Sequence, residues 1–243
     1  MKLDHIIIIF VFILCGCNKP NSPDCFQQAG DAHLDWRELP AYDRIEIRDN
    51  IQVVLVQSEE EKIAVEGPKN LLPEIITEVS QGVLEIRNDN TCNFVRSYKH
   101  RYVVKIYSSR IRNIVNHGNG DVKSTNTLIG DYLFFENKRS IGKIELQFEM
   151  DSMRFLNTTG YSDIELKGTV DELFLFHQGV GLMDASRVDA RSVFINSNSI
   201  NDAYVQFRDY MFAALNDNGN IYYEGPSQTI DVSQPGAGSL IAQ

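Results

Sequence analysis

The chain has 243 residues, of which 33 are acidic and 23 are basic, so its formal net charge is −10. This negative charge disfavours nucleic acid and the anionic face of a membrane as partners, because both are themselves negatively charged. The length is sufficient for one elongated domain or two small ones. After residue 17, no stretch approaches the roughly 20 apolar residues that a transmembrane helix needs.

The first 17 residues have the layout of an export signal. Lys2 precedes the apolar run HIIIIFVFIL, which is too short to span a bilayer. The sequence Leu14-Cys15-Gly16-Cys17 then fits the bacterial lipobox, whose last cysteine is acylated and becomes the first mature residue. We therefore predict a lipoprotein signal peptide over residues 1–16 and a lipid anchor on Cys17, with acyl chains such as palmitate. The alternatives are an ordinary cleaved signal or an uncleaved anchor.

The residue after the predicted anchor bears on its location. Asn18 is not the aspartate that retains some lipoproteins in the inner membrane. The outer membrane is therefore the predicted location, with the protein facing either the periplasm or the cell surface.

Two cysteines, Cys25 and Cys92, remain after removal of the signal and acylation of Cys17. In an oxidising compartment an even number of thiols usually pairs, so we predict a disulfide between them. Two free buried thiols are the alternative. A zinc site is disfavoured, because neither cysteine has another Cys or a His at ligand spacing.

The segment 17–39 is predicted to be a tether, because it carries prolines and no sustained period. Alternation of apolar and polar residues begins directly afterwards, and we predict a strand-rich N-terminal part over residues 40–110. A turn or one short helix is expected in NLLPEIITEVS, where Leu72, Ile75, Ile76 and Val79 fall at helical spacing.

Residues 111–230 repeat with a period of about 20 residues. Leu133, Met153, Leu173 and Val193 follow this period, as do Phe135, Phe155, Leu175 and Ile195. Turn clusters such as NHGNGD and NTTGYSD separate the two strands of each unit. The pattern predicts an all-β fold, a right-handed parallel β-helix with about 20-residue coils, preceded by a strand-rich N-terminal cap and followed by a C-terminal tail at 231–243. An antiparallel meander is the alternative.

Several of these motifs together resemble a known family. The corners HGNGDV, GYSDI and NGNIYYEGP, with IRDNIQVVL and LEIRNDNTCNFVRSY, are similar to the head GIN domain family, described as auto-transporter adhesins. The likeness covers about residues 38–227. It implies a β-helical fold on an exported or lipid-anchored protein with a binding role. HQGVGLM and NSNSINDAYV lack the Gly-Asp corner, which argues against a regular ligand-binding role for these corners.

The sequence contains no G-x-S-x-G, H-E-x-x-H or Walker motif, so no enzyme class is indicated. Asp131, Asp151 and Asp171 recur at a 20-residue step and predict a ladder of carboxylates about 5 Å apart. Such a ladder needs exposure to solvent, basic neighbours such as Lys138, Arg139 and Arg154, or a bound cation. Calcium is the candidate cation, and a glycan-cleaving acidic pair is a further alternative. The simplest interpretation is that aspartate begins each strand after a turn.

Two further sets of side chains are assigned from their positions. His117 and His177 fall in turn clusters and are predicted to be surface residues. Tyr98, Tyr102, Tyr107, Tyr222 and Tyr223 are candidates for rings that bind glycans or proteins. The simpler interpretation is that these tyrosines pack half-buried on strands or form a surface strip.

Three function classes follow from the sequence. The first is a lipid-anchored, non-enzymatic envelope protein with an adhesin-like binding role, for a glycan or another external partner. The second is a structural envelope lipoprotein that binds another envelope protein. The third is a glycan-active β-helix enzyme. No cofactor is expected beyond the calcium candidate.

Overall fold

The computed structural model describes residues 28–91 and 100–243. All four cysteines lie outside these ranges, so the signal peptide, the lipid on Cys17 and the Cys25–Cys92 disulfide stay predictions. Across the described ranges, no helix is long and apolar enough to cross a membrane.

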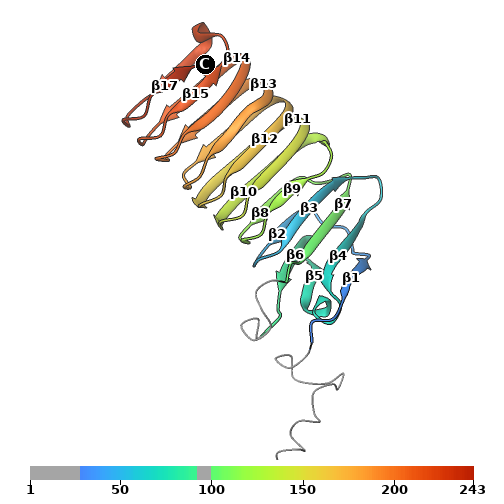
Figure 1. Ribbon diagram of the computed structural model, residues 1–243. Helices are drawn as coiled ribbons and strands as arrows, with labels where there is room; N and C mark the ends of the chain where they lie inside the picture. Colours follow the sequence, from blue (N-terminus) through green and yellow to red (C-terminus); the bar gives the residue numbers. More distant parts are fainter. Residues whose placement is uncertain (1–27, 92–99) are drawn as a thin grey trace, which may run out of the picture.

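The C-terminal two thirds of the chain form a flattened β-solenoid of about 20-residue coils (Figure 1). Its long strands are β10 (Leu128–Ser140), β11 (Ile144–Gly160), β12 (Ile164–His177), β13 (Met183–Ser197) and β14 (Ala203–Leu215). They pair in parallel in that order, with Leu133 opposite Met153, then Leu173, then Val193. This register confirms the parallel β-helix and excludes the antiparallel meander.

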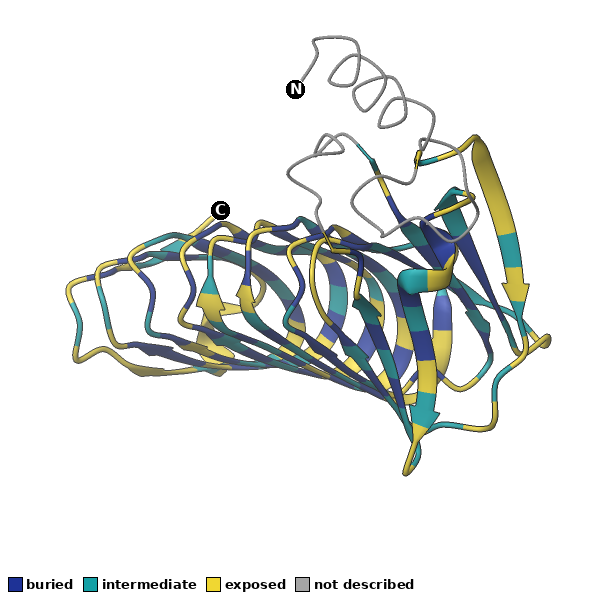
Figure 2. Ribbon diagram, turned by 90° about the horizontal axis from the view of Figure 1, so that it is seen from below, coloured by how far each residue is buried: buried dark blue, intermediate teal, exposed yellow. Residues whose placement is uncertain are grey.

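The core lies between the two faces of each coil (Figure 2). Two of its ladders are the predicted ones, Leu133, Met153, Leu173 and Val193, and Phe135, Phe155, Leu175 and Ile195. A third consists of Ile144, Ile164, Met183, Ala203 and Ile221, and every side chain in the three ladders is at most 3% exposed. The rings of Phe135 and Phe155 stack with their centroids 5.0 Å apart. Each large apolar side chain buried in this way contributes about 1.5–3 kcal/mol to folding, so stacking identical registers builds a continuous core.

The N-terminal part continues both faces of the solenoid and then closes its end. Parallel strands extend the two faces: β2 (Arg44–Ile47), β6 (Val83–Asn88) and β8 (Asn113–Asn116) on one; β3 (Gln52–Gln57), β7 (Val103–Ser108) and β9 (Val122–Ser124) on the other. β8 joins β10, and β9 joins β11. The last strands at this end are antiparallel: β5 (Ile75–Ser80) on β6, β4 (Lys62–Pro68) on β7, and β1 (Ala32–Arg37) on β4. The end of the solenoid is therefore covered by strands that share its core.

Of the turn or short helix predicted in NLLPEIITEVS, the structure contains the turn, and the helical spacing beyond it does not form a helix. Leu72–Glu74 form a 3-10 turn that contains Pro73, and the chain then continues as β5. Four of the five residues from Ile75 to Val79 are β-branched, which disfavours a helix and favours a strand. The antiparallel partner β6 supplies backbone hydrogen bonds that an isolated short helix would lack.

The two ends of the described chain are more ordered than a tether and a tail would be. Within the predicted tether, Ala32–Arg37 form β1, and Arg37 donates hydrogen bonds to the carbonyl of Leu72 and to Thr77. After β15 (Ile221–Glu224), two strands occupy the region predicted to be a tail: β16 (Ile230–Ser233) pairs in parallel with β14, and β17 (Leu240–Ala242) pairs in parallel with β15. Residues 230–242 therefore add a final coil, because short apolar segments there meet an available strand edge.

Candidate functional site

The aspartate ladder is present and lies on one edge of the solenoid. The residues that flank Asp131, Asp151 and Asp171 pair in register, so the three aspartates lie side by side on successive coils. Asp131 forms an ion pair with Arg112 at 3.4 Å, and Asp171 with Arg191 at 3.3 Å. The predicted basic neighbours are wrong: Lys138 pairs with Glu136, whereas arginines one coil before and one coil after the ladder neutralise its ends.

Cation binding by this ladder has no further support. Side-chain exposure is 80% for Asp131 and 54% for Asp171, and exposed carboxylates are screened by solvent. Among the residues that the structure describes, no three His, Cys, Asp or Glu side chains converge to hold a metal ion. Calcium binding stays a prediction.

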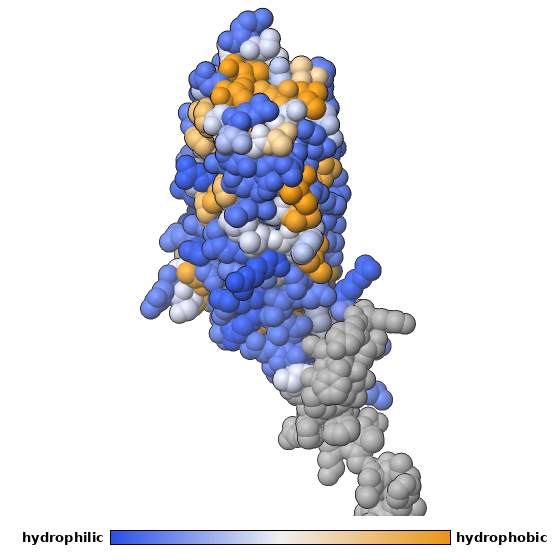
Figure 3. Space-filling model, turned by 90° about the vertical axis from the view of Figure 1, so that its left-hand side faces the viewer, coloured by the Kyte–Doolittle hydropathy of each residue, from blue (hydrophilic) through white to orange (hydrophobic). Residues whose placement is uncertain are grey.

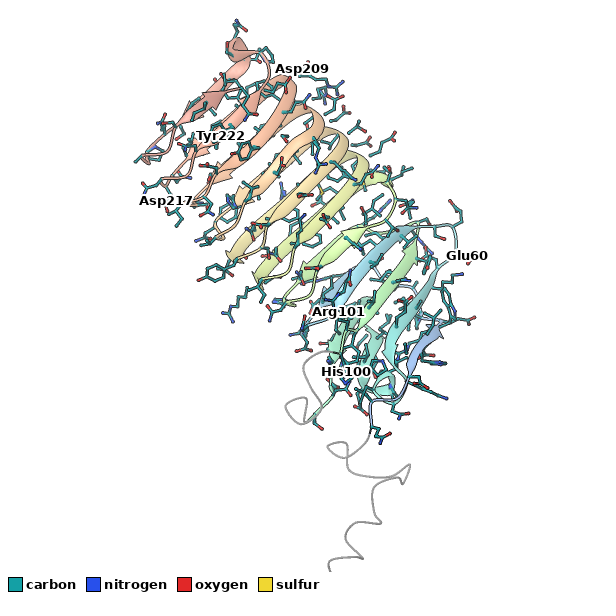
Figure 4. All side chains as sticks on the ribbon, viewed as in Figure 1. Glu60, His100, Arg101, Asp209, Asp217 and Tyr222 are labelled. Atoms are coloured by element: carbon teal, nitrogen blue, oxygen red, sulfur yellow. The ribbon has the colours of Figure 1, made fainter. Side chains whose placement is uncertain are left out.

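The repeated Gly-Asp corners have a structural role. They lie at the turn edge, which contains Asp217 and is opposite the edge of Asp209 (Figure 4). Asp121 accepts a hydrogen bond from the backbone N–H of Lys143 at 2.9 Å, and Asp163 accepts one from Leu182 at 3.0 Å. Asp202, in a corner without the glycine, accepts one in the same way from the backbone N–H of Asn220 at 3.0 Å. Each carboxylate thus holds the next coil in place, which explains these corners without a ligand.

The turn edge also carries exposed apolar side chains. They are Ile141, Tyr161, Val180, Leu182 and Ile200. The left-hand side of Figure 1, on which Asp217 lies, faces the viewer in Figure 3, where hydrophobic patches are interrupted by hydrophilic side chains. These side chains lie in the turns of successive coils, and the hydrophilic side chains between them divide the edge into small apolar patches.

A ladder of buried polar side chains runs beside this edge inside the solenoid. Asn116 donates from its Nδ2 to Oδ1 of Asn137 at 3.0 Å, and Asn137 donates in the same way to Asn157 at 3.0 Å. His177 occupies the next position, with its Nδ1 3.5 Å from Nδ2 of Asn157. The prediction that His177 is a surface residue is wrong, since it is fully buried. His117 is half-buried.

Burial of His177 makes stability depend on pH. Desolvation lowers the pKa of His177 to about 4, whereas an imidazole in an unfolded chain has a pKa of about 6.5. Between these values the unfolded chain binds a proton that the folded protein does not, so this stability is present above about pH 6.5 and lost as pH falls. We expect His177 to account for a loss of about 2 kcal/mol between pH 7 and pH 5.

Urea unfolding of the wild type and of His177→Asn at the two pH values measures this loss. Asparagine at 177 would continue the amide ladder without a titratable group, so the variant should lose about 2 kcal/mol less than the wild type on acidification. An equal loss in both proteins would contradict the assignment.

The tyrosines proposed as ligand-binding rings mostly serve packing. Tyr102 and Tyr223 are buried, and Tyr98 lies outside the described residues. Tyr107 packs against Trp36 with ring centroids 5.7 Å apart. Tyr222, labelled in Figure 4, stacks on Tyr204 at 4.8 Å.

A column of phenylalanines on the outer face of the solenoid was not predicted. Phe174, Phe194 and Phe212 are paired in register on β12, β13 and β14. The rings of Phe174 and Phe194 stack at 4.7 Å and 10°. One coil earlier, the guanidinium carbon of Arg154 lies 5.2 Å from the centre of the Phe174 ring, a cation–π distance.

A shallow apolar groove lies beside this column. Its volume is about 410 Å³, and it is lined by Arg154, Leu156, Phe174, Leu175, Phe176, Phe194, Ile195, Asn196 and Phe212. The other face of the same coils carries a charged cluster, in which Lys143 binds Glu145 and Glu165. We therefore take the groove as the apolar candidate site. The sequence did contain a signal for this column. It is the 20-residue step from Phe174 to Phe194, one position along the strand from the inward ladder.

Parallel β-solenoids closed at one end and open along their sides form a class of repeat proteins that present extended surfaces for binding. In this chain, the described side chains form the apolar groove and the side-chain ladders on successive coils. Residues 41–227 match the model of the family described as "Putative auto-transporter adhesin, head GIN domain", and the chain belongs to this family. The resemblance in the sequence is thereby confirmed.

Solved structures share the fold. A "putative adhesin" from Bacteroides fragilis superposes with a TM-score of 0.78 at 21% identity, covering 88% of this chain and 97% of that chain. A "putative adhesin" from Parabacteroides merdae gives 0.66 at 18% identity, covering 89% and 98%. A "putative lipid binding protein" from Parabacteroides distasonis gives 0.65 at 18% identity, covering 88% and 97%. None of the curated proteins compared matches the chain.

Proposed function

We propose that this protein is a non-enzymatic binding module of the cell envelope, held at the membrane by lipid on Cys17. It uses the side of its solenoid to bind an external partner, as the description of its family implies. The outer membrane is the location that Asn18 favours. The apolar groove beside Phe174, Phe194 and Phe212 is the observation that carries this proposal.

Two features of the described residues support binding over catalysis. The carboxylates of the aspartate ladder spread along an exposed edge, and the two at its ends form ion pairs with arginines, whereas a catalytic pair needs contrasting environments. The groove, in contrast, is an open apolar surface bordered by a cation, which is typical of a recognition site.

The anchor is tested with two cysteine variants of the full-length chain. We expect the wild type and Cys15→Ser in the membrane fraction, with a mature mass that lacks residues 1–16 and includes lipid. Cys17→Ser should be at least about tenfold less abundant in the membrane fraction than the wild type, because anchoring by acyl chains contributes about 0.8 kcal/mol per buried CH₂. Cell fractionation and intact mass spectrometry give both readouts.

Equal fractionation of the two variants, or an unlipidated chain that begins at Met1, would contradict the anchor. Binding is tested separately on glycan arrays and against isolated envelope components, with Phe212→Asp as the groove variant and Tyr161→Ser as its control. A partner that still binds Tyr161→Ser but no longer binds Phe212→Asp supports the function. The absence of any partner in both collections would count against it.

A further inference from the structure

We propose that the groove binds the hydrocarbon chain of a single-chain amphiphile whose anionic headgroup pairs with Arg154. This inference rests on the proposed binding function and specifies its ligand class. It is carried by the shape of the groove, the polar atoms in its lining, and the charges at its two ends.

The groove runs along the solenoid axis between two outward columns. Phe174, Phe194 and Phe212 form one wall. Leu156 and Phe176 belong to the other wall, and each lies two residues further along its strand than the first column. With strands about 4.8 Å apart, four successive coils span roughly 14 Å. The groove is therefore longer than it is wide, which suits an extended chain.

The ring geometry disfavours a sugar. Sugars stack on the open faces of aromatic rings, but Phe174 has Phe194 stacked at 4.7 Å on one side and Arg154 at 5.2 Å on the other. Phe194 has Tyr210 as a further neighbour at 5.8 Å. The column therefore presents ring edges, which are apolar C–H groups, to a ligand in the groove.

The lining also disfavours a peptide. The backbone groups of β12, β13 and β14 are used in the parallel ladders between them, so a peptide would bury its own N–H and C=O groups without partners. Besides Arg154, Asn196 is the polar side chain in the lining. It already accepts hydrogen bonds from Asn198 and Asn216. A hydrocarbon chain needs no such partners.

The charges at the ends of the column give the ligand a direction. Arg154 is exposed and forms no ion pair with any residue that the structure describes, although the chain has a net charge of −10. Lys138 on β10 and Arg191 on β13, by contrast, are paired with acidic side chains. At the other end, Phe212 pairs in register with Asp231. An anionic headgroup is therefore attracted to Arg154 and repelled by Asp231.

Photo-crosslinking tests this inference on the full-length chain in detergent-free cell extracts. The probe is a 16-carbon fatty acid that carries a diazirine and an alkyne, and adducts are mapped by mass spectrometry after immunoprecipitation. We expect adducts in peptides from β12 to β14, with labelling about tenfold lower in Phe194→Ser and about threefold lower in Arg154→Glu. Tyr161→Ser, which removes an exposed ring from the turn edge, should label like the wild type.

Competition identifies the headgroup. Palmitate should abolish the labelling, whereas hexadecyltrimethylammonium, with a chain of equal length and the opposite charge, should not. Equal labelling of all variants, adducts elsewhere in the chain, or competition by the cationic amphiphile would overturn the inference. Arg154 is exposed, so loss of folding would not explain a result with Arg154→Glu. The assay does not depend on membrane attachment, so the failure of the anchor and of the ligand assignment can be distinguished.

Discussion

Gly168→Ala is expected to lower the free energy of unfolding by about 4 kcal/mol. Gly168 lies in β12 with a φ of +130°, where a side chain is strained. A Cβ atom there would lie 1.8 Å from the carbonyl oxygen of Phe148 in the preceding coil. Because that atom belongs to the backbone of the neighbouring rung, relief requires the two coils to separate and weakens the parallel pairing between β11 and β12.

Gly130→Ala is the matched control for this effect. Gly130 lies in β10, and its added Cβ would meet only the flexible side chain of Met150, at 3.5 Å. Alanine there should change the free energy of unfolding by less than about 1 kcal/mol. Urea unfolding of both variants measures the difference. Similar stabilities for the two proteins would show that the coils do not approach as closely as the structure indicates.

Asn137→Ala is expected to cost about 3 kcal/mol, because it removes the middle of the buried amide ladder. The substitution leaves Nδ2 of Asn116 without its acceptor and Oδ1 of Asn157 without its donor, and both side chains are fully buried. Each unsatisfied buried group costs about 1–3 kcal/mol. The decrease in the free energy of unfolding should therefore be several times larger than the decrease caused by loss of a single exposed hydrogen bond.

Asn196→Ala provides the control at an exposed position. Asn216 donates to Asn196 at 2.8 Å across one coil, the same type of contact as in the ladder, but both residues are exposed. Water replaces the lost partner there, so the cost should stay below about 1 kcal/mol. Thermal melts and urea midpoints of the two variants give the comparison. Equal costs would mean that burial does not strengthen the ladder.

One register produces all of the ladders on this solenoid. Because coils repeat at about 20 residues, residues of one kind at that spacing align across neighbouring strands. Apolar residues then form the core, asparagines the buried amide ladder, aspartates the charged edge, and phenylalanines the outer column. The same stacking that stabilises the fold therefore also assembles the groove, one residue from each coil.

The sequence by itself determined the class of fold. Alternation of apolar residues along each strand and the 20-residue step between Leu133, Met153, Leu173 and Val193 were sufficient to predict parallel coils and their inward ladders. Both signals are local or strictly periodic, and burying an apolar ladder leaves few alternatives to the observed register. The family motifs were recognisable for the same reason, since the Gly-Asp corners recur where the chain turns.

The tertiary structure alone decided how the remaining side chains are used. It turned His177 inward although a turn sequence surrounds it, and it placed Arg112 and Arg191 at the ends of the aspartate ladder. It also made a strand of Ile75–Ser80 by pairing it with β6. These outcomes depend on contacts between neighbouring coils and on the direction in which each corner turns. A local pattern does not encode such contacts, so the groove beside Arg154 emerges only when the coils are stacked.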